Sequence, residues 1–273
     1  MTNNFMIAYQ GSEGSYSEEL LKKEFSNYSF ISCESFTGLF NKVSSENCLG
    51  LLPVENSIAG TVNEAYEELI NSGLEIFGEY IKKIDHTLIG LSNSKFEEIT
   101  NVISHPQALQ QCSKFLQDSK LRITPVFDTA GSVFEILETK DINTAAIAGE
   151  HFKNDERFKI LKENISNHKE NFTRFLLIGN EKLESNKENN KYSSVLISDD
   201  KPGSLLKALN IFSDLNINLT KLESRPILGR PWEYKFYIDY ELQNVKTQTE
   251  LIDGIKKVSK EFIILGHYPK ANP

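Results

Sequence analysis

The chain has 273 residues, of which 39% are hydrophobic and 25% charged, and a formal net charge of -8. The length predicts about two domains, and the composition is that of a globular protein. The acidic balance and the lack of a lysine and arginine cluster argue against nucleic-acid binding, which depends on clustered cations. The N-terminus has no signal-peptide pattern, and no run of about 18 apolar residues predicts a membrane span. We therefore expect a cytoplasmic protein with neither nucleic-acid nor membrane partners.

The cysteines and histidines do not show the spacing of metal ligands. Cys33, Cys48 and Cys112 are odd in number and form no Cys-x-x-Cys pair, so we expect reduced thiols rather than disulfides or a zinc site. The five histidines also lack ligand spacing. The sequence therefore predicts no bound metal.

The chain opens with a short apolar strand at residues 5–9, followed by Gly11 and Gly14. Residues 15–18 (SYSE) have the Ser-x-x-Glu form of a helix start. A strand, a glycine turn and a helix N-terminus form a corner that favours anions. A helix over residues 35–44 follows, with apolar residues at i, i+3, i+4 and i+7 that predict one buried face.

The next apolar strand ends in a polar cluster of Glu55, Asn56 and Ser57. Thr61 and Glu64 then predict a capping box for the following helix. Three polar side chains between a buried strand and a helix need partners or a ligand. We therefore interpret the cluster as functional.

The middle of the chain alternates strands with helical segments. Strands are expected over residues 74–91, 101–104, 122–127 and 144–148, and helix starts at 105–106 and 128–132. This alternation predicts parallel sheets covered on both faces. The chain passes between two sets of such units near residues 81–86 and again near 165–173. We therefore expect two lobes with a cleft between them.

Residues 171–179 (NFTRFLLIG) predict a buried strand with two polar side chains, Thr173 and Arg174, near its N-terminal end. Strand ends are rigid positions, and in open α/β sheets ligands bind beside them. The alternative is a surface threonine and arginine at the start of a strand.

Residues 181–191 are polar and almost without core formers, which predicts a linker. Strands and helices then follow in the order βαββαβ, which fits a split ferredoxin-like module. The strands are expected at 192–198, 218–224, 232–240 and 262–267, and the helices begin near 202 and 247. Pro226 is expected to end the ladder of the second strand.

Four stretches together resemble the prephenate dehydratase family. They are residues 51–57 (LLPVENS), 104–112 (SHPQALQQC), 171–175 (NFTRF) and 223–226 (ESRP). The last resembles the ACT regulatory domain that follows the catalytic part in this family. The resemblance covers nearly the whole chain, in order.

The resemblance implies an α/β fold with a two-lobed, periplasmic-binding-protein-like catalytic region and a ferredoxin-like ACT domain. The catalytic domain is expected at residues 1–180, with lobe 1 at about 1–80 plus 172–180 and lobe 2 at about 85–165. The linker at 181–191 would then lead to an ACT domain at 192–273. No chorismate mutase domain is expected before the first strand, so the resemblance implies a monofunctional enzyme.

The implied reaction is the loss of carbon dioxide and water from prephenate to give phenylpyruvate, in phenylalanine biosynthesis. Aromatisation drives this reaction without an electron sink, so no cofactor is expected. The resemblance also implies feedback inhibition by L-phenylalanine, and ACT domains that pair in a homodimer or homotetramer.

The resemblance and the polar clusters together assign site residues. The expected catalytic residues are Thr173, Glu55, Asn56 and Gln111. The expected substrate-binding residues are Arg174, Ser57, Ser104, Thr129, Ala130 and Phe175. The expected effector-binding residues are Gly203, Ser204, Leu205, Asn218, Leu219, Glu223, Ser224, Arg225 and Pro226.

Among these, Thr173 is expected to donate a hydrogen bond to the leaving hydroxyl. Arg174 could bind a carboxylate or form a structural ion pair. Asn56 and Gln111 could donate amide hydrogens to carboxylate oxygens, and Glu55 could supply a proton or orient Asn56.

Two positions depart from the family pattern. Gly203-Ser204-Leu205-Leu206 replaces a glycine-alanine-leucine-valine segment, which alters the effector pocket in size and polarity. Asp128-Thr129-Ala130 replaces a serine-threonine-alanine segment, which adds a carboxyl near the substrate.

Three other functions remain open from the sequence. One is arogenate dehydratase, the same elimination on a substrate with an amine in place of the keto group. Another is a non-catalytic small-anion-binding protein with an ACT tail. The third is an ACT-bearing regulator without chemistry, which the roughly 180 residues before the linker disfavour.

Overall fold

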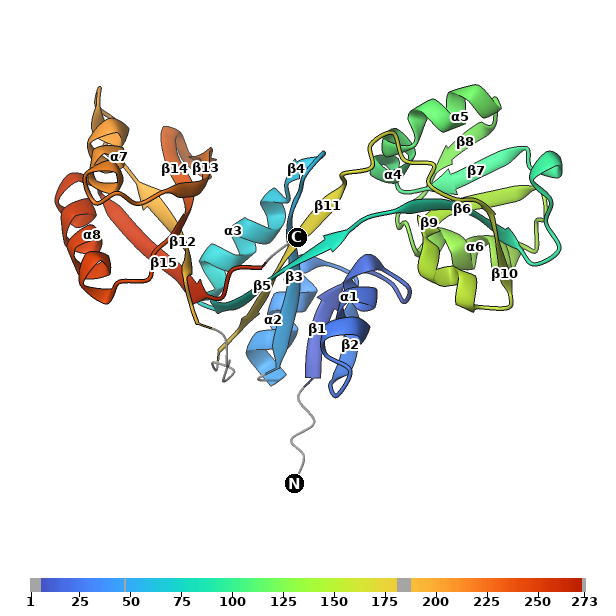
Figure 1. Cartoon of the computed structure of the whole chain (residues 1–273), viewed down its shortest axis with the longest axis horizontal. Helices are drawn as coiled ribbons and strands as arrows, with labels where there is room; N and C mark the ends of the chain where they lie inside the picture. The colour runs from blue at the N-terminus through green and yellow to red at the C-terminus, as the bar shows by residue number, and fades with distance from the viewer. Residues whose placement is uncertain (1–5, 47, 181–187, 272–273) are drawn as a thin grey trace. The chain divides into compact units, whose positions relative to one another are not determined.

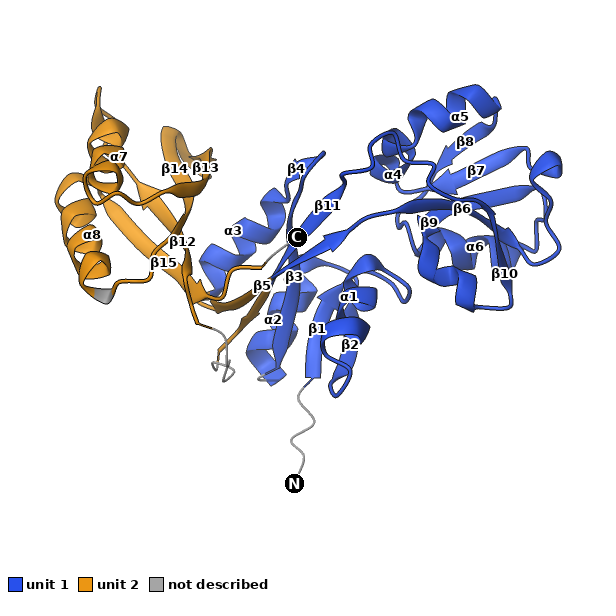
Figure 2. Cartoon of the chain, in the orientation of Figure 1, with its two compact units in different colours: residues 1–72, 80–176, 273 blue, residues 73–79, 177–272 orange. Residues whose placement is uncertain are grey.

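The structure is a computed structural model that describes residues 6–46, 48–180 and 188–271. The chain divides into two compact units, shown in Figure 2. Unit 1 comprises the residues up to 72 together with 80–176, and unit 2 comprises 73–79 together with 177–272. Most of the predicted linker, residues 181–187, lies outside the described residues, so the predicted domain boundaries stay predictions.

Unit 1 contains two sheets (Figure 1). The elements of the first are β1 (Met6–Gln10), α1 (Tyr16–Glu24), β2 (Ser29–Cys33), α2 (Phe36–Glu46), β3 (Leu49–Asn56), β4 (Gly60–Thr61), α3 (Asn63–Ser72), β5 (Glu75–Lys83) and β11 (Phe172–Gly179). The strand order is β5-β11-β3-β1-β2, with β4 paired to β3. Strand β1 is parallel to both β2 and β3, as βαβ units require.

The second sheet of unit 1 has the strand order β10-β6-β9-β7-β8. Its elements are β6 (His86–Leu91), β7 (Asn101–Ser104), α4 (Pro106–Gln111), α5 (Ser113–Ser119), β8 (Arg122–Pro125), α6 (Gly131–Thr139), β9 (Thr144–Gly149) and β10 (Phe158–Lys162), with 3-10 helices at Phe96–Glu98 and Glu150–Asn154. Strands β7, β8 and β9 are parallel, but β6 and β10 are antiparallel to their neighbours. The prediction of purely parallel sheets was therefore wrong. Strand β6 enters directly from β5 and has no crossover helix to set its direction.

Both faces of this second sheet are covered, as predicted (Figure 1). Successive side chains of its strands pack into two different hydrophobic cores, one on each face of the sheet. Leu88 and Val102 pack with α4 and α5, whereas Ile89 and Ile103 pack with α6. This is the period of two expected for a strand with both faces buried.

The two segments predicted to connect the lobes, near residues 81–86 and 165–173, run beside each other. The Ile84 N–H donates to the Asn171 carbonyl at 2.8 Å, and the Ile165 N–H donates to the His86 carbonyl at 3.2 Å. These bonds hold the start of β6 against the segment that leads into β11.

Unit 2 contains the predicted βαββαβ module. Its elements are β12 (Lys191–Ile197), α7 (Ser204–Asp214), β13 (Leu219–Ile227), β14 (Arg230–Glu241), α8 (Val245–Val258) and β15 (Glu261–Tyr268). The antiparallel strand order β13-β14-β12-β15 is that of a ferredoxin-like sheet. Both helices pack on one core that includes Phe212, Ile238 and Leu251.

The segment 73–79 also belongs to unit 2. Gly266 of β15 pairs with Ile76 of β5, and a Cβ at Gly266 would lie 2.4 Å from the Ile76 carbonyl oxygen, so only glycine fits this approach. Glu79 forms an ion pair with Lys191 at 2.6 Å, with side chains only 1% and 9% exposed. The second Glu79 oxygen accepts from the Ala271 N–H at 2.9 Å.

Two local predictions were wrong. Pro226 does not end the ladder, because β13 continues to Ile227 and Pro226 pairs with Tyr234. Strand β13 lies at the edge of its sheet, where proline is tolerated. Thr61 pairs with Glu55 in β4, and α3 begins two residues later, at Asn63, so the helix does not begin directly after Thr61 as predicted.

Among the described residues, no helix is long and apolar enough to cross a membrane.

Candidate active site

A cavity of about 600 Å³ opens in unit 1, where predicted residues from several elements meet. Asn56, Gln111, Thr129, Ala130, Thr173 and Phe175 all line it. No lysine or arginine is among its described lining residues, and Asp128 supplies its one carboxylate. A ligand with negative charge would therefore be held by neutral donors and by backbone N–H groups.

Strand alternation decides which polar residues face the cavity. Asn56 on β3 and Thr173 on β11 line it, whereas their sequence neighbours Glu55 and Arg174 do not. Successive side chains of a strand point to opposite faces. Glu55 and Arg174 instead approach each other, with 3.7 Å between the carboxylate and the guanidinium.

The amide of Asn56 is oriented by backbone donors. The N–H groups of Ile58 and Ala59 donate to Asn56 Oδ1 at 3.1 and 2.9 Å, so its nitrogen must face the opposite way. That nitrogen lies 3.1 Å from Thr173 Oγ1 and 3.2 Å from the Phe172 carbonyl. An amide nitrogen only donates, so Thr173 accepts this bond and keeps its own proton for another partner.

This geometry does not support the predicted role of Asn56 as a direct donor to substrate. One of its amide hydrogens serves Asn171 Oδ1 at 2.7 Å, and the other serves Thr173 and Phe172. Gln111 differs, because its nitrogen has one protein acceptor, Asn56 Oδ1 at 3.4 Å, and two hydrogens to give. Gln111 can therefore still donate into the cavity.

Two predicted substrate-binding residues have structural partners outside the cavity. Ser57 Oγ accepts from the Phe172 N–H at 2.9 Å and donates to the Glu170 carbonyl at 3.3 Å, which fixes the start of β11. Ser104 is fully buried, and its hydroxyl donates to the Ile147 carbonyl at 2.7 Å. Neither side chain lines the cavity.

Two nine-residue helices begin at the cavity. Ser15 caps α1 by accepting from the Glu18 N–H, as predicted, and lines the cavity together with Gly14. Helix α6 begins beside Thr129 and Ala130. The positive ends of both helix dipoles favour an anion there.

Both oxygens of the Asp128 carboxylate accept hydrogen bonds from the protein. Its Oδ1 accepts from the Gly131 N–H at 2.7 Å, which closes the turn that leads into α6. Its Oδ2 accepts from the Ser12 hydroxyl at 2.9 Å. Asp128 therefore connects the glycine turn before α1 to the start of α6.

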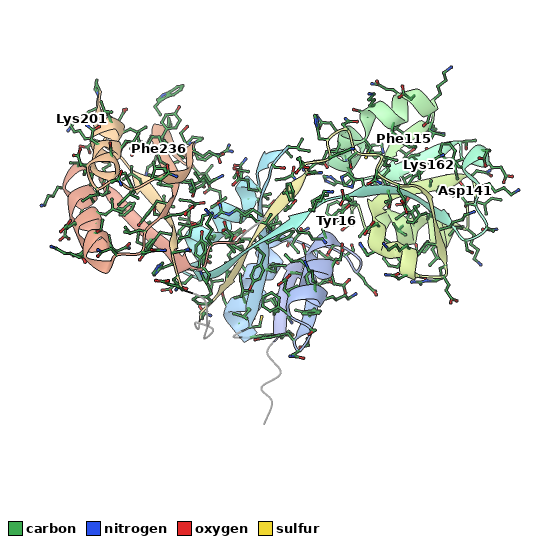
Figure 3. All side chains as sticks on the ribbon, in the orientation of Figure 1. Tyr16, Phe115, Asp141, Lys162, Lys201 and Phe236 are labelled. Atoms are coloured by element: carbon green, nitrogen blue, oxygen red, sulfur yellow. The ribbon has the colours of Figure 1, made fainter. Side chains whose placement is uncertain are left out.

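Tyr16 and His86 also line the cavity, although neither is among the site residues expected from the sequence (Tyr16 is labelled in Figure 3). His86 belongs to a strand that is buried throughout, so the sequence pattern there indicated core residues rather than a site residue. Burial lowers the pKa of His86 and raises the pKa of Tyr16 well above its ordinary value. Both groups are therefore neutral near pH 7.

The described residues contain no group of three histidine, cysteine or acidic side chains placed to hold a metal ion. The cavity lining consists of hydroxyls, amides, two imidazoles, one carboxylate and apolar side chains. Such a lining can orient a small polar molecule and donate hydrogen bonds to it.

A smaller hollow of about 340 Å³ lies in unit 2. The predicted effector residues Gly203, Ser204 and Leu205 line it. The remaining predicted effector residues lie on or next to β13 and do not line it: they are Asn218, Leu219, Glu223, Ser224, Arg225 and Pro226. Trp232, which the sequence analysis did not single out, lines the hollow and is 79% exposed.

On β13, Glu223 contacts Lys221 at 3.0 Å and also pairs with Arg225. These residues form a charged row on the edge strand. Gly203 has a φ of +83°, a left-handed conformation that favours glycine directly before α7.

Comparison with known proteins identifies the family. The family model for prephenate dehydratase matches residues 7–183. The prephenate dehydratase of Methanocaldococcus jannaschii is 37% identical over 97% of this chain and 98% of its own length. Arogenate dehydratase/prephenate dehydratase 1 of Arabidopsis thaliana is 34% identical over 96% of this chain and 71% of its own.

The solved structure of Arthrobacter aurescens prephenate dehydratase in complex with L-Phe has the same fold. Its TM-score is 0.87 at 24% identity, over 97% of this chain and 90% of that chain. The family match covers the segment that builds the cavity, and the relatives align along nearly the whole sequence. The chain is an enzyme of aromatic amino acid biosynthesis and belongs to the prephenate dehydratase family.

Proposed function

We propose that the cavity of unit 1 is where this enzyme removes carbon dioxide and water from prephenate, with Thr173 donating to the leaving hydroxyl. The observation that carries this proposal is the contact between Asn56 and Thr173. Because Asn56 donates to Thr173 Oγ1, the threonine proton is free for the substrate. A threonine is too weak an acid to transfer its proton fully, so it positions the hydroxyl or relays a proton to it.

The lining also suits the decarboxylation. Phe175, Ile84 and Val126 present apolar surface, and no described lining residue is a lysine or an arginine. A carboxylate that departs as carbon dioxide is lost more readily where it is poorly solvated. The second carboxylate would be held by neutral donors such as Gln111 and Thr129, and by the N-terminus of α1.

The experiment is the substitution Thr173→Val, which keeps the shape and removes the donor. We expect kcat for phenylpyruvate formation to fall about a hundred- to a thousandfold, with little change in KM, because the lost bond acts mainly in the transition state. The matched control is Thr124→Val, on β8, whose hydroxyl bonds Asn101 and does not line the cavity. A Thr173→Val enzyme with nearly normal kcat would exclude Thr173 from the mechanism.

Asp128 favours a second candidate substrate, arogenate. Arogenate carries an ammonium group where prephenate has a keto group, and Asp128 is the one carboxylate among the described lining residues. An ammonium beside it would gain an ionic contact. The ratio of kcat/KM for the two substrates decides between them, and a ratio above one for arogenate would reverse the assignment.

We also propose that L-phenylalanine binds to unit 2 and inhibits the enzyme. The predicted residues Gly203, Ser204 and Leu205 line a hollow there, and large apolar side chains are exposed nearby. Exposed apolar groups of this kind suit contact between copies of the chain, in a homodimer or homotetramer. The predicted effector residues on β13 would then contribute from the paired module.

A further inference from the structure

A continuous chain of hydrogen bonds connects Thr173 to the interior of unit 1. Asn171 is fully buried and bonds two amides at once. Its Oδ1 accepts from Asn56 at 2.7 Å, and its Nδ2 donates to Gln111 Oε1 at 3.1 Å. Gln111 Oε1 also lies 2.7 Å from His86 Nε2. The chain thus runs from His86 through the amides to the Thr173 hydroxyl.

The donor and the acceptor of every hydrogen bond between His86 and Asn56 can be assigned. Backbone N–H groups orient Asn56, so its nitrogen donates to Asn171 Oδ1. Asn171 therefore presents its own nitrogen to Gln111. Because Gln111 Oε1 can only accept, His86 must carry a proton on Nε2.

The other side of the His86 ring is also occupied. The Tyr16 hydroxyl lies 3.0 Å from His86 Nδ1 and 3.0 Å from the Asp85 carbonyl. With Nε2 protonated, a neutral His86 presents Nδ1 as an acceptor, so the single tyrosine proton is shared between Nδ1 and the Asp85 carbonyl. His86 is thereby held between Tyr16 and Gln111, and it is 3% exposed.

We propose that His86 is a positioning residue for the reaction. It holds Gln111 Oε1, which holds Asn171, and Asn171 in turn accepts from the Asn56 nitrogen that lies beside Thr173 Oγ1. Without the Nε2 proton, the amide of Gln111 can rotate, and Asn171 then loses the acceptor that fixes its own amide. The Asn56 oxygen stays bonded to Ile58 and Ala59, but its nitrogen is held less firmly beside Thr173, so the threonine hydroxyl is less well placed to donate to the leaving hydroxyl. This inference rests on the proposed role of Thr173.

The test is a double-mutant cycle on the full-length chain with His86→Leu and Thr173→Val. We expect His86→Leu alone to lower kcat about tenfold to a hundredfold, the cost of one lost buried bond, with KM within about threefold. In the Thr173→Val background, His86→Leu should lower kcat by less than about twofold, because the donor that His86 positions is absent. Equal losses in both backgrounds would show that His86 acts only through general stability and would overturn the proposal.

Two further variants separate positioning from folding. His86→Gln places an amide nitrogen near the position of Nε2 and should recover most of kcat. His151→Leu is the matched control, because this ring also packs beside Tyr16 but lies outside the hydrogen-bond chain. It should leave kcat within about twofold of the parent. A His86→Gln enzyme as slow as His86→Leu would contradict the proposal.

A measurement without substrate tests the same geometry. Nitrogen-15 NMR of the histidine rings in the parent protein should show His86 protonated on Nε2 and unprotonated on Nδ1 near pH 7. The opposite tautomer would overturn the proposal even if the variants fail to fold. If Thr173→Val alone leaves kcat intact while the Nε2 tautomer is observed, the proposed role of Thr173 fails and the hydrogen-bond chain stands.

Discussion

Thr173 and Arg174 are adjacent in sequence, but only Thr173 lines the cavity. The same holds for Asn56 and Glu55 on the neighbouring strand. Because strand residues alternate in direction, a run of polar residues at a strand end cannot all face one ligand. A contiguous motif therefore combines a residue that can act on substrate with one that supports the opposite face.

At the residue scale, Glu19 should make the free energy of unfolding depend on pH in the acid range. Burial alone would raise its pKa, but contacts with His151 at 3.1 Å and Lys82 at 3.0 Å outweigh burial and lower the pKa from 4.5 to about 2. A lowered folded-state pKa contributes stability that is complete above the unfolded value and is lost as pH falls through the folded value. This contribution should therefore disappear between about pH 4.5 and pH 2.

The measurement is the free energy of unfolding in urea at several values between pH 5 and pH 2. We expect Glu19→Gln to be less stable than the parent at pH 5, and the difference should shrink as the pH falls. Glu138→Gln, at an exposed position on α6, is the control and should show no such trend. A difference between Glu19→Gln and the parent that stays constant with pH would contradict this account.

At the scale of elements, the chain after Pro106 forms two helices. Its apolar residues keep one helical spacing, but α4 ends at Gln111 and α5 begins at Ser113. Asn167 inserts at the break: its N–H donates to the Gln111 carbonyl at 2.7 Å, and its Oδ1 accepts from the Lys114 N–H. A distant residue satisfies the groups that the break frees, which periodicity along one segment cannot reveal.

Asp128 gives a prediction for α6, because its side chain closes the turn that leads into that helix and accepts from the N–H of Gly131, its first residue. Asp128→Ala should lower the free energy of unfolding by about 1 kcal/mol, the usual cost of a lost cap, and Asp128→Ser should cost less because it keeps an acceptor. Urea unfolding at pH 7 measures both. Asp118→Ala, at an exposed position on α5, should change stability by less than about 0.5 kcal/mol. Equal losses for the alanine and serine variants would argue against capping.

At the scale of the whole molecule, unit 2 is not a continuous segment of the chain. It takes in residues 73–79, whose Glu79 carboxylate pairs with Lys191 in a buried ion pair. A charge buried this deeply needs its partner, since an unpaired buried charge is strongly destabilising. The C-terminal βαββαβ module is therefore tied to a segment that lies more than a hundred residues earlier in the chain.

The proposed inhibition by phenylalanine is also a property of the whole molecule, because the effector and the reaction occupy different units. L-phenylalanine should lower the rate at subsaturating prephenate. Trp232→Ala should raise the concentration for half inhibition about tenfold, since a buried aromatic contact contributes about 1 kcal/mol or more. Leu228→Ala is the matched control: Leu228 is also exposed on the β13–β14 hairpin but does not line the hollow. A rate independent of phenylalanine would refute the proposal.

The sequence by itself determined the class of most elements, the order βαββαβ of the C-terminal module and the family. These depend on periodicity, capping residues and contiguous motifs, which are local properties of the chain. It also indicated Asn56 and Thr173, because polar residues beside buried strands need partners, and it indicated Gln111 through the resemblance to the family.

Only the tertiary structure decided which hydrogen bonds those residues make. The direction of the amide chain depends on backbone N–H groups at Ile58 and Ala59 and on the buried His86, which no spacing connects to Thr173. The antiparallel strands β6 and β10 and the inclusion of residues 73–79 in unit 2 likewise depend on pairings between distant segments. Hydrogen bonds have directions that are set by all partners together, and those partners meet only when the chain has folded.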